Sequence, residues 1–148
     1  MLVRDYMTKN VFSLPGDKKL FVAKQIMEWA HVRHVPVVDR EEHVLGLISH
    51  RDLLNASISS ILTPIANAER NQHLWSIPAE KVMHKDVRTI SPDAPIQNAA
   101  RIMRTEKIGC LLVVEHDKLI GILTEYDLLM IVEELGKRPA TSHQNPHP

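Results

Sequence analysis

The sequence is poor in cysteine and glycine, with one cysteine and five glycines in 148 residues. The single cysteine, Cys110, excludes an intramolecular disulfide, and its apolar neighbours indicate a buried small side chain. The glycines form neither a GxGxxG nor a GxxxxGK pattern, which excludes the phosphate loops of Rossmann and P-loop proteins. We identify no nucleophile with a base and no asymmetric pair of carboxylates. We therefore predict that the chain is not an enzyme and has no catalytic residues.

Net charge and long apolar runs are also missing. Lysine and arginine total 18, as do aspartate and glutamate, so the formal net charge is zero. Proteins that bind duplex DNA usually carry a basic excess on one face, so we expect no nucleic-acid partner. No run approaches the ~18 apolar residues that cross a bilayer. The N-terminal sequence MLVRDYMTKN also lacks the apolar stretch of a signal peptide. We expect a cytoplasmic protein without membrane contact.

The chain contains an internal repeat. With a shift of one residue in the loop before Gly46, two copies align and share identical residues at Met7/Met83, Asp17/Asp93, Met27/Met103, Val38/Val114, Gly46/Gly121 and Asp52/Asp127. Identity and apolar pattern persist together through both copies, which indicates a duplication.

Each copy predicts the same order of elements. A short extended piece (11–14 or 87–90) precedes a helix with an apolar stripe, and a hairpin of two apolar runs follows. A second helix begins near Ser49 or Thr124. A β-α-β-β-α unit of about sixty residues buries too little surface to be stable alone. We therefore predict an α+β (α/β) fold in which two units pack sheet against sheet with pseudo-twofold symmetry.

The domain boundaries follow from this repeat. We predict a first repeat at 1–62, a connecting segment at 63–78 and a second repeat at 79–136. The connecting segment should hold a short helix at about 66–75, between Pro64 and Pro78. Residues 137–148 lack apolar side chains and are predicted to form a flexible tail.

Both copies end their second strand with a hydroxyl residue followed three positions later by aspartate: Ser49 with Asp52, and Thr124 with Asp127. This spacing is close to a capping box, worth ~1 kcal/mol without any ligand. The same helix start can also bind phosphate, because its N–H groups and dipole favour anions. An aspartate there can accept hydrogen bonds from ribose hydroxyls. The residues alone leave both interpretations open.

The β-α-β-β-α order, the Val-Pro-Val-Val-Asp run at 35–39 and the Gly-x-Ile-Ser-x-x-Asp-Leu phrase resemble the cystathionine β-synthase (CBS) domain family. The tandem arrangement over about 3–136 resembles the CBS pair, or Bateman module. The resemblance implies a non-catalytic sensor that needs no cofactor and binds AMP, ADP or ATP in clefts between the repeats. It also implies a homodimer that signals occupancy in trans to a protein partner whose identity the sequence does not give.

The resemblance also implies two sets of nucleotide-binding residues. The first cleft would contain Ser49, Asp52, Arg33, His34, Arg51, Val87 and Ile108, and the second Thr124, Asp127, Val11, Val32 and Lys107. The aspartates would bind ribose, the hydroxyl residues phosphate and the apolar residues adenine. Because phosphate chains need cationic partners, we hypothesise that the Asp52 cleft prefers the more highly phosphorylated ligand.

Other interpretations remain. The clefts could stay empty in a constitutive dimerisation or scaffold module, or could bind S-adenosylmethionine, a cyclic dinucleotide or Mg²⁺. Nine histidines invite a zinc interpretation, and His31 and His34 lie close in sequence. Neither a cysteine pair nor a carboxylate–histidine motif accompanies them to complete four ligands, so we predict no metal site.

Overall fold

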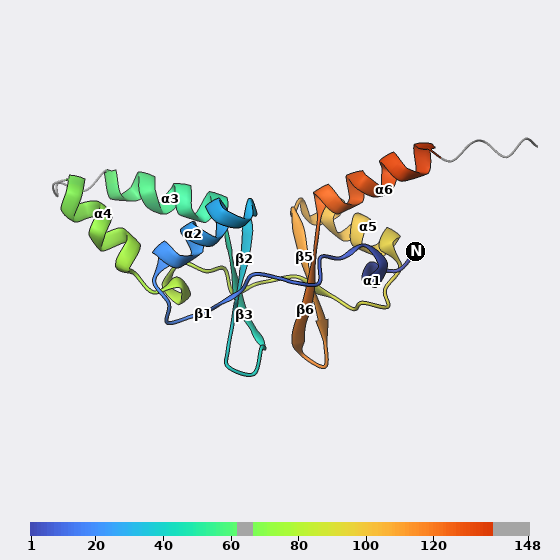
Figure 1. Ribbon diagram of the computed structural model, residues 1–148, viewed down its shortest axis with the longest axis horizontal. Coiled ribbons are helices and arrows are strands. Elements are labelled where there is room, and N and C mark those ends of the chain that lie inside the picture. Colours follow the sequence, from blue (N-terminus) through green and yellow to red (C-terminus); the bar gives the residue numbers. More distant parts are fainter. Residues whose placement is uncertain (62–66, 138–148) are drawn as a thin grey trace, which may run out of the picture.

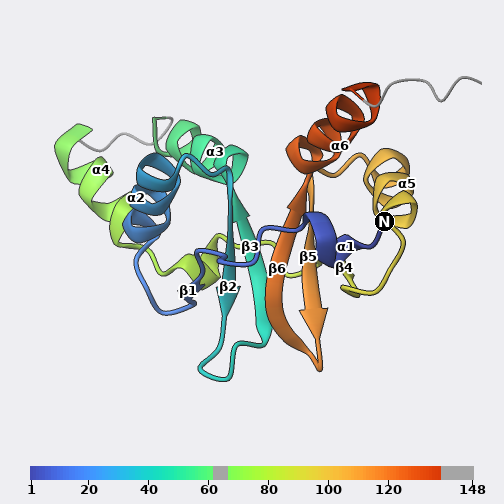
Figure 2. The same cartoon turned by 45° about the vertical axis from the view of Figure 1, so that its right-hand side comes forward.

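The protein, described here from a computed structural model over residues 1–61 and 67–137, contains two three-stranded sheets (Figure 1). The first has the order β1 (Leu14–Pro15), β2 (His34–Val38), β3 (Val44–Ser49), and the second β4 (Thr89–Ile90), β5 (Cys110–Glu115), β6 (Lys118–Thr124). In each sheet the short first strand is parallel to the second, and the remaining two form an antiparallel hairpin. The two sheets lie next to each other at the centre of the molecule (Figure 2).

Helices lie on the outer sides of the sheets. The first repeat carries α2 (Leu20–Ala30), α3 (His50–Ile61) and α4 (Asn67–Ser76), and the second α5 (Ile96–Glu106) and α6 (Glu125–Lys137). The predicted α+β class and the β-α-β-β-α order are thus confirmed. Within the part of the chain that the structure describes, no helix is both long and apolar enough to cross a membrane.

The connecting segment contains the helix predicted there, as α4, which packs back on the first repeat through buried Leu74. The predicted positions 62–66, with Pro64, lie outside the described residues, as do 138–148 of the predicted tail. The domain boundaries themselves remain a prediction.

The two repeats exchange their leading segments (Figure 1). Helix α1 (Val3–Tyr6) packs on the second repeat, where Val3 is fully buried and donates its N–H to the carbonyl of Ala94 at 2.9 Å. The 3₁₀ helix η1 (Ala79–Lys81) packs on the first repeat in the same way, and Ala79 donates to the carbonyl of Lys18 at 2.7 Å. Each repeat is therefore completed by residues that precede the other.

The matched glycines in β3 and β6 are explained by this exchange. A Cβ on Gly46 would lie 2.5 Å from Sδ of Met83, and one on Gly121 would lie 2.6 Å from Sδ of Met7. Both methionines belong to the exchanged segments. Glycine is needed at both positions because a foreign segment crosses the strand there.

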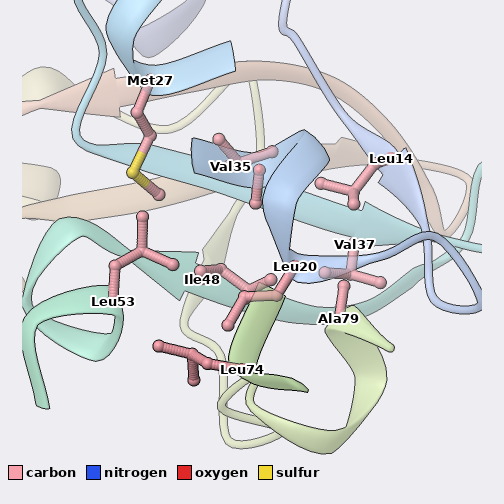
Figure 3. Close-up of a cluster of buried hydrophobic side chains, with 10 residues drawn as sticks. Leu14, Leu20, Met27, Val35, Val37, Ile48, Leu53, Leu74 and Ala79 are labelled. Carbon is pink, nitrogen blue, oxygen red and sulfur yellow. The ribbon is translucent and has the colours of Figure 1, made fainter. Parts of the chain in front are cut away.

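Three clusters of buried side chains hold the fold together. The cluster of the first repeat includes Leu14, Leu20, Met27, Val35, Val37, Ile48, Leu53, Leu74 and Ala79 (Figure 3). An equivalent cluster in the second repeat includes Val3 from α1. The third cluster lies between the sheets, where Cys110, Leu112 and Ile122 pack against Val44 and Leu47 of the first repeat. This third cluster joins the repeats into one body and places the two strand–helix junctions near each other.

Candidate functional site

Each junction between hairpin and second helix contains the predicted cap. The N–H and Oγ of Ser49 donate to Oδ2 of Asp52 at 2.6 and 2.8 Å, and the N–H of Asp52 donates back to Oγ of Ser49 at 3.2 Å. The N–H and Oγ1 of Thr124 donate to Oδ2 of Asp127 at 2.7 and 2.8 Å. Capping therefore occupies one carboxylate oxygen in each repeat and leaves the other for a different partner.

The second carboxylate oxygen differs between the repeats. Oδ1 of Asp52 lies 2.6 Å from Nε2 of His84, and Asp52 is 9% exposed. Because an ionised carboxylate only accepts hydrogen bonds, Nε2 is the donor. Asp127 is half-buried, and among the described residues its Oδ1 has no hydrogen-bond partner. The two predicted ribose-binding carboxylates are therefore not equivalent.

A cavity of about 690 Å³ lies beside Asp127, within the usual range for small-molecule sites. Both repeats contribute to it, with Val11, Phe12, Val32, Arg33 and His34 from the first and Ile122, Thr124, Glu125, Tyr126 and Asp127 from the second. Four of the five residues predicted for the second cleft line this cavity. The fifth, Lys107, is not among the described residues that line it. Lys107 aligns with His31 in the repeat, and His31 does line the cavity.

The structure places Arg33 and His34, which were predicted for the first cleft, in the lining of the Asp127 cavity. Arg33 directly precedes β2 and His34 is its first residue, beside the start of β5: a Cβ on Gly109 would lie 3.6 Å from Cε1 of His34. Both residues therefore lie near the start of α6 in the opposite repeat, and His34 is also close enough to Asp52 of its own repeat to feel its charge.

The remaining residues predicted for the first cleft lie apart from this cavity. Val87 is half-buried against the cluster between the sheets, and Ile108 is half-buried against the core of the second repeat. Arg51 is exposed on the first turn of α3. Around Asp52 itself, the nearest polar group from the opposite repeat is the imidazole of His84.

Burial controls the ionisation of two groups near the centre. Burial lowers the pKa of His34 below its ordinary value, against the opposing effect of the Asp52 and Glu125 carboxylates, while Arg33 lowers the pKa further. Burial raises the pKa of Cys110 to about 12, with a further contribution from Glu125. His34 is therefore mainly neutral at neutral pH, and Cys110 is a protonated thiol packed between the sheets.

Sequence reasoning missed several residues at this site. Phe12 lines the cavity and packs edge-on against Trp29, with ring centroids 5.4 Å apart. Its equivalent in the second repeat is Arg88, whose Nε donates to Glu106 at 2.6 Å, so only one of the two positions carries an aromatic ring. His84 was also missed, although the repeat alignment that pairs it with Thr8 contains the signal.

One further cluster could in principle hold a metal ion. Ligand atoms of Asp39, Glu41 and His43, in the β2–β3 turn, lie within 4.8 Å of one another. Oδ1 of Asp39 already accepts the N–H groups of Glu41 and His43 at 2.9 and 2.8 Å. The arrangement is that of an aspartate shaping a turn, and its groups are partly or fully exposed.

Comparisons with known proteins agree with this architecture. The chain is 32% identical to a CBS domain-containing protein of Dictyostelium discoideum, covering 96% of this chain and 99% of that protein. It spans less than half of the other curated relatives compared with it. The crystal structure of the protein AcuB from Vibrio cholerae is 38% identical, with a TM-score of 0.78 and coverage of 91% of this chain and 92% of that chain.

Two ligand complexes share the fold at 22% identity and a TM-score of 0.76. One is the CBS domain pair of protein MJ0100 with 5′-methylthioadenosine and S-adenosylmethionine, covering 91% of this chain and 98% of that chain. The other is CBSX2 with AMP, covering 92% and 98%. The family model described as CBS domain matches residues 3–59 and 79–134. The chain therefore belongs to the CBS domain family, as a tandem pair of CBS domains.

Proposed function

We propose that this CBS pair is a regulatory module without catalytic chemistry that binds an adenosine-containing ligand, AMP in first place, in the Asp127 cleft. The proposal rests on one observation: Oδ1 of Asp127 has no hydrogen-bond partner among the described residues, and Asp127 lines a cavity of about 690 Å³. The AMP, S-adenosylmethionine and methylthioadenosine complexes of two structurally similar pairs support the class of ligand.

The lining residues suit the parts of such a ligand. Ribose hydroxyls would donate to the free oxygen of Asp127. Val11, Val32 and Phe12 would contact the adenine ring, since planar bases bind well between apolar and aromatic side chains. A phosphate would face Thr124 and the start of α6, whose N–H groups and dipole favour anions.

The charges around the cavity favour few phosphates. Arg33 lines it together with the two carboxylates of Glu125 and Asp127, so its positive charge is more than offset, and burial keeps His34 mainly neutral. A triphosphate would lack cationic partners here. We therefore propose a preference for AMP over ATP in the Asp127 cleft. We do not retain the sequence-based hypothesis that the Asp52 cleft takes the more phosphorylated ligand, because Arg33 and His34 both line the Asp127 cavity.

The ligand would act as a bridge between the repeats. It would contact Val11 and Val32 from one repeat and Thr124 and Asp127 from the other. A ligand that binds one relative arrangement of the repeats better shifts the population toward it. We propose that a protein partner reads this shift.

We also propose a homodimer. Helices α3 and α6 lie along the same side of the molecule (Figure 1). Both expose apolar side chains: Leu54 and Ile58 on α3, and Leu129, Val132 and Leu135 on α6. These residues are spaced three or four apart and form stripes. Exposed apolar stripes of this kind favour association with a second copy.

A thermal-shift screen tests the proposed function. AMP, ADP, ATP, S-adenosylmethionine, a cyclic dinucleotide and Mg²⁺ would each be added to the purified chain. Ligand at ~100 times Kd should add ~2.7 kcal/mol to the free energy of unfolding, and we expect the largest effect with AMP. The scaffold alternative is supported by Asp52, because both of its carboxylate oxygens already accept hydrogen bonds within the protein. No shift with any of these compounds would favour that alternative.

A further inference from the structure

The two exchanged segments place different side chains at equivalent positions. His84 forms two backbone hydrogen bonds with Leu47 in β3, both 2.9 Å. Thr8 forms the equivalent pair with Ile122 in β6, at 2.9 and 3.0 Å. Because the backbones are held in the same way, the difference between the clefts at this point comes from the side chains alone.

His84 is hydrogen-bonded to Oδ1 of Asp52, whereas the equivalent oxygen of Asp127 has no partner among the described residues. Its Nε2 lies 2.6 Å from Oδ1 of Asp52, while Ser49 occupies Oδ2. The imidazole is 67% exposed and the carboxylate beneath it 9% exposed, so the ring covers Asp52 from the solvent side. In the second cleft Thr8 lines the cavity, and its shorter side chain leaves Oδ1 of Asp127 uncovered.

We infer that His84 is the residue that closes the first cleft, so that each chain binds one adenosine-containing ligand rather than two. This inference rests on the proposed function of the Asp127 cleft. A ribose that approached Asp52 would have to displace the imidazole and break a hydrogen bond to an ionised carboxylate, one of the stronger classes of hydrogen bond in proteins. The Asp52 cleft should therefore bind at least about tenfold more weakly than the Asp127 cleft.

The reciprocal exchange of Thr8 and His84 tests the inference. Isothermal titration calorimetry with AMP would compare the wild-type chain, His84→Thr and Thr8→His, with Asp127→Asn and the double variant Asp127→Asn/His84→Thr as references. We expect one site per chain in the wild type and a second site in His84→Thr that persists in the double variant. Thr8→His should weaken the wild-type site by about tenfold or more, because the imidazole would pair with Asp127.

The outcomes separate the inference from the proposed function. If the wild type binds one AMP and His84→Thr gains no second site, His84 is not the closing residue, while the proposed function stands. If the wild type binds none but His84→Thr binds at Asp52, His84 does close the first cleft, while the Asp127 site and the count of one ligand per chain are refuted. Two equal sites in the wild type, or no binding to either protein, would overturn the inference. Because each variant carries the side chain of the equivalent position, both should fold, as the unfolding midpoint would verify.

Discussion

Met83 lies directly over Gly46, so closely that a Cβ at this glycine would also meet the carbonyl oxygen of His84 at 2.7 Å. In the other repeat, Met7 lies over Gly121, where the carbonyl of Thr8 would be 3.1 Å from the added carbon. A methionine side chain can move away, but a backbone carbonyl held in a strand pair cannot easily do so.

The first prediction follows from this difference. Gly46→Ala should lower the free energy of unfolding by about 2–3 kcal/mol and Gly121→Ala by about 1–2 kcal/mol, the usual cost of overpacking. Urea denaturation followed by circular dichroism measures both values. If the two substitutions cost the same, or Gly121→Ala costs more, the backbone contact at Gly46 is not the deciding one.

The second prediction concerns Cys110. A buried thiol with a pKa of about 12 holds almost no thiolate at pH 8, and the thiolate is the reactive form. Ellman's reagent should therefore leave the native protein unmodified over minutes and should titrate one thiol per chain in guanidinium chloride. Fast, complete reaction of the native protein would place the thiol at an open surface.

The third prediction concerns the pH dependence of ligand binding. Burial lowers the pKa of His34 in the free protein, and a phosphate bound beside it would raise that pKa again. The complex then holds more protons than the free protein, so binding tightens as the pH falls. AMP affinity should rise about threefold or more from pH 8 to pH 6, and His34→Gln should flatten this profile. An equally steep profile in His34→Gln would assign the proton uptake to another group.

The fourth prediction concerns the apolar stripe on α6. Leu129 and Val132 are each 66% exposed, and a glutamate at position 129 would place a charge in the proposed dimer interface. Leu129→Glu should therefore shift the mass measured by light scattering from dimer to monomer. A matched control is Glu133→Gln on the same helix, which should leave the mass unchanged. A monomeric wild-type protein would contradict the proposed dimer.

The parts of the structure that depend on local interactions were predictable from the sequence. The repeat and the order of elements were predictable because apolar periodicity can be recognised over a few residues. The two caps were predictable because Ser49 and Asp52, like Thr124 and Asp127, are only three residues apart. The exchange of α1 and η1 was not, since it pairs residues far apart in the chain. The place of Arg33 and His34 in the lining of the Asp127 cavity was not predictable for the same reason. Which cavity a residue at the start of β2 lines depends on how the two sheets pack against each other.

The hydrogen bond through which His84 covers Asp52 has no local signature in the sequence. A single histidine in an extended segment is compatible with many environments, and only the contact between Nε2 of His84 and Oδ1 of Asp52 gives it a role. The alignment of His84 with Thr8 does mark a difference between otherwise matched segments. In duplicated proteins, such differences are therefore useful places to look for divergence between sites.

The most direct test is calorimetric titration of AMP into the wild type, Asp127→Asn and Asp52→Asn. The two substitutions alter equivalent caps, that of α3 and that of α6, so each controls for the structural effect of the other. The account predicts that Asp127→Asn weakens AMP binding by about tenfold or more, whereas Asp52→Asn changes it less than about threefold. Equal losses in the two variants, or a loss confined to Asp52→Asn, would contradict it.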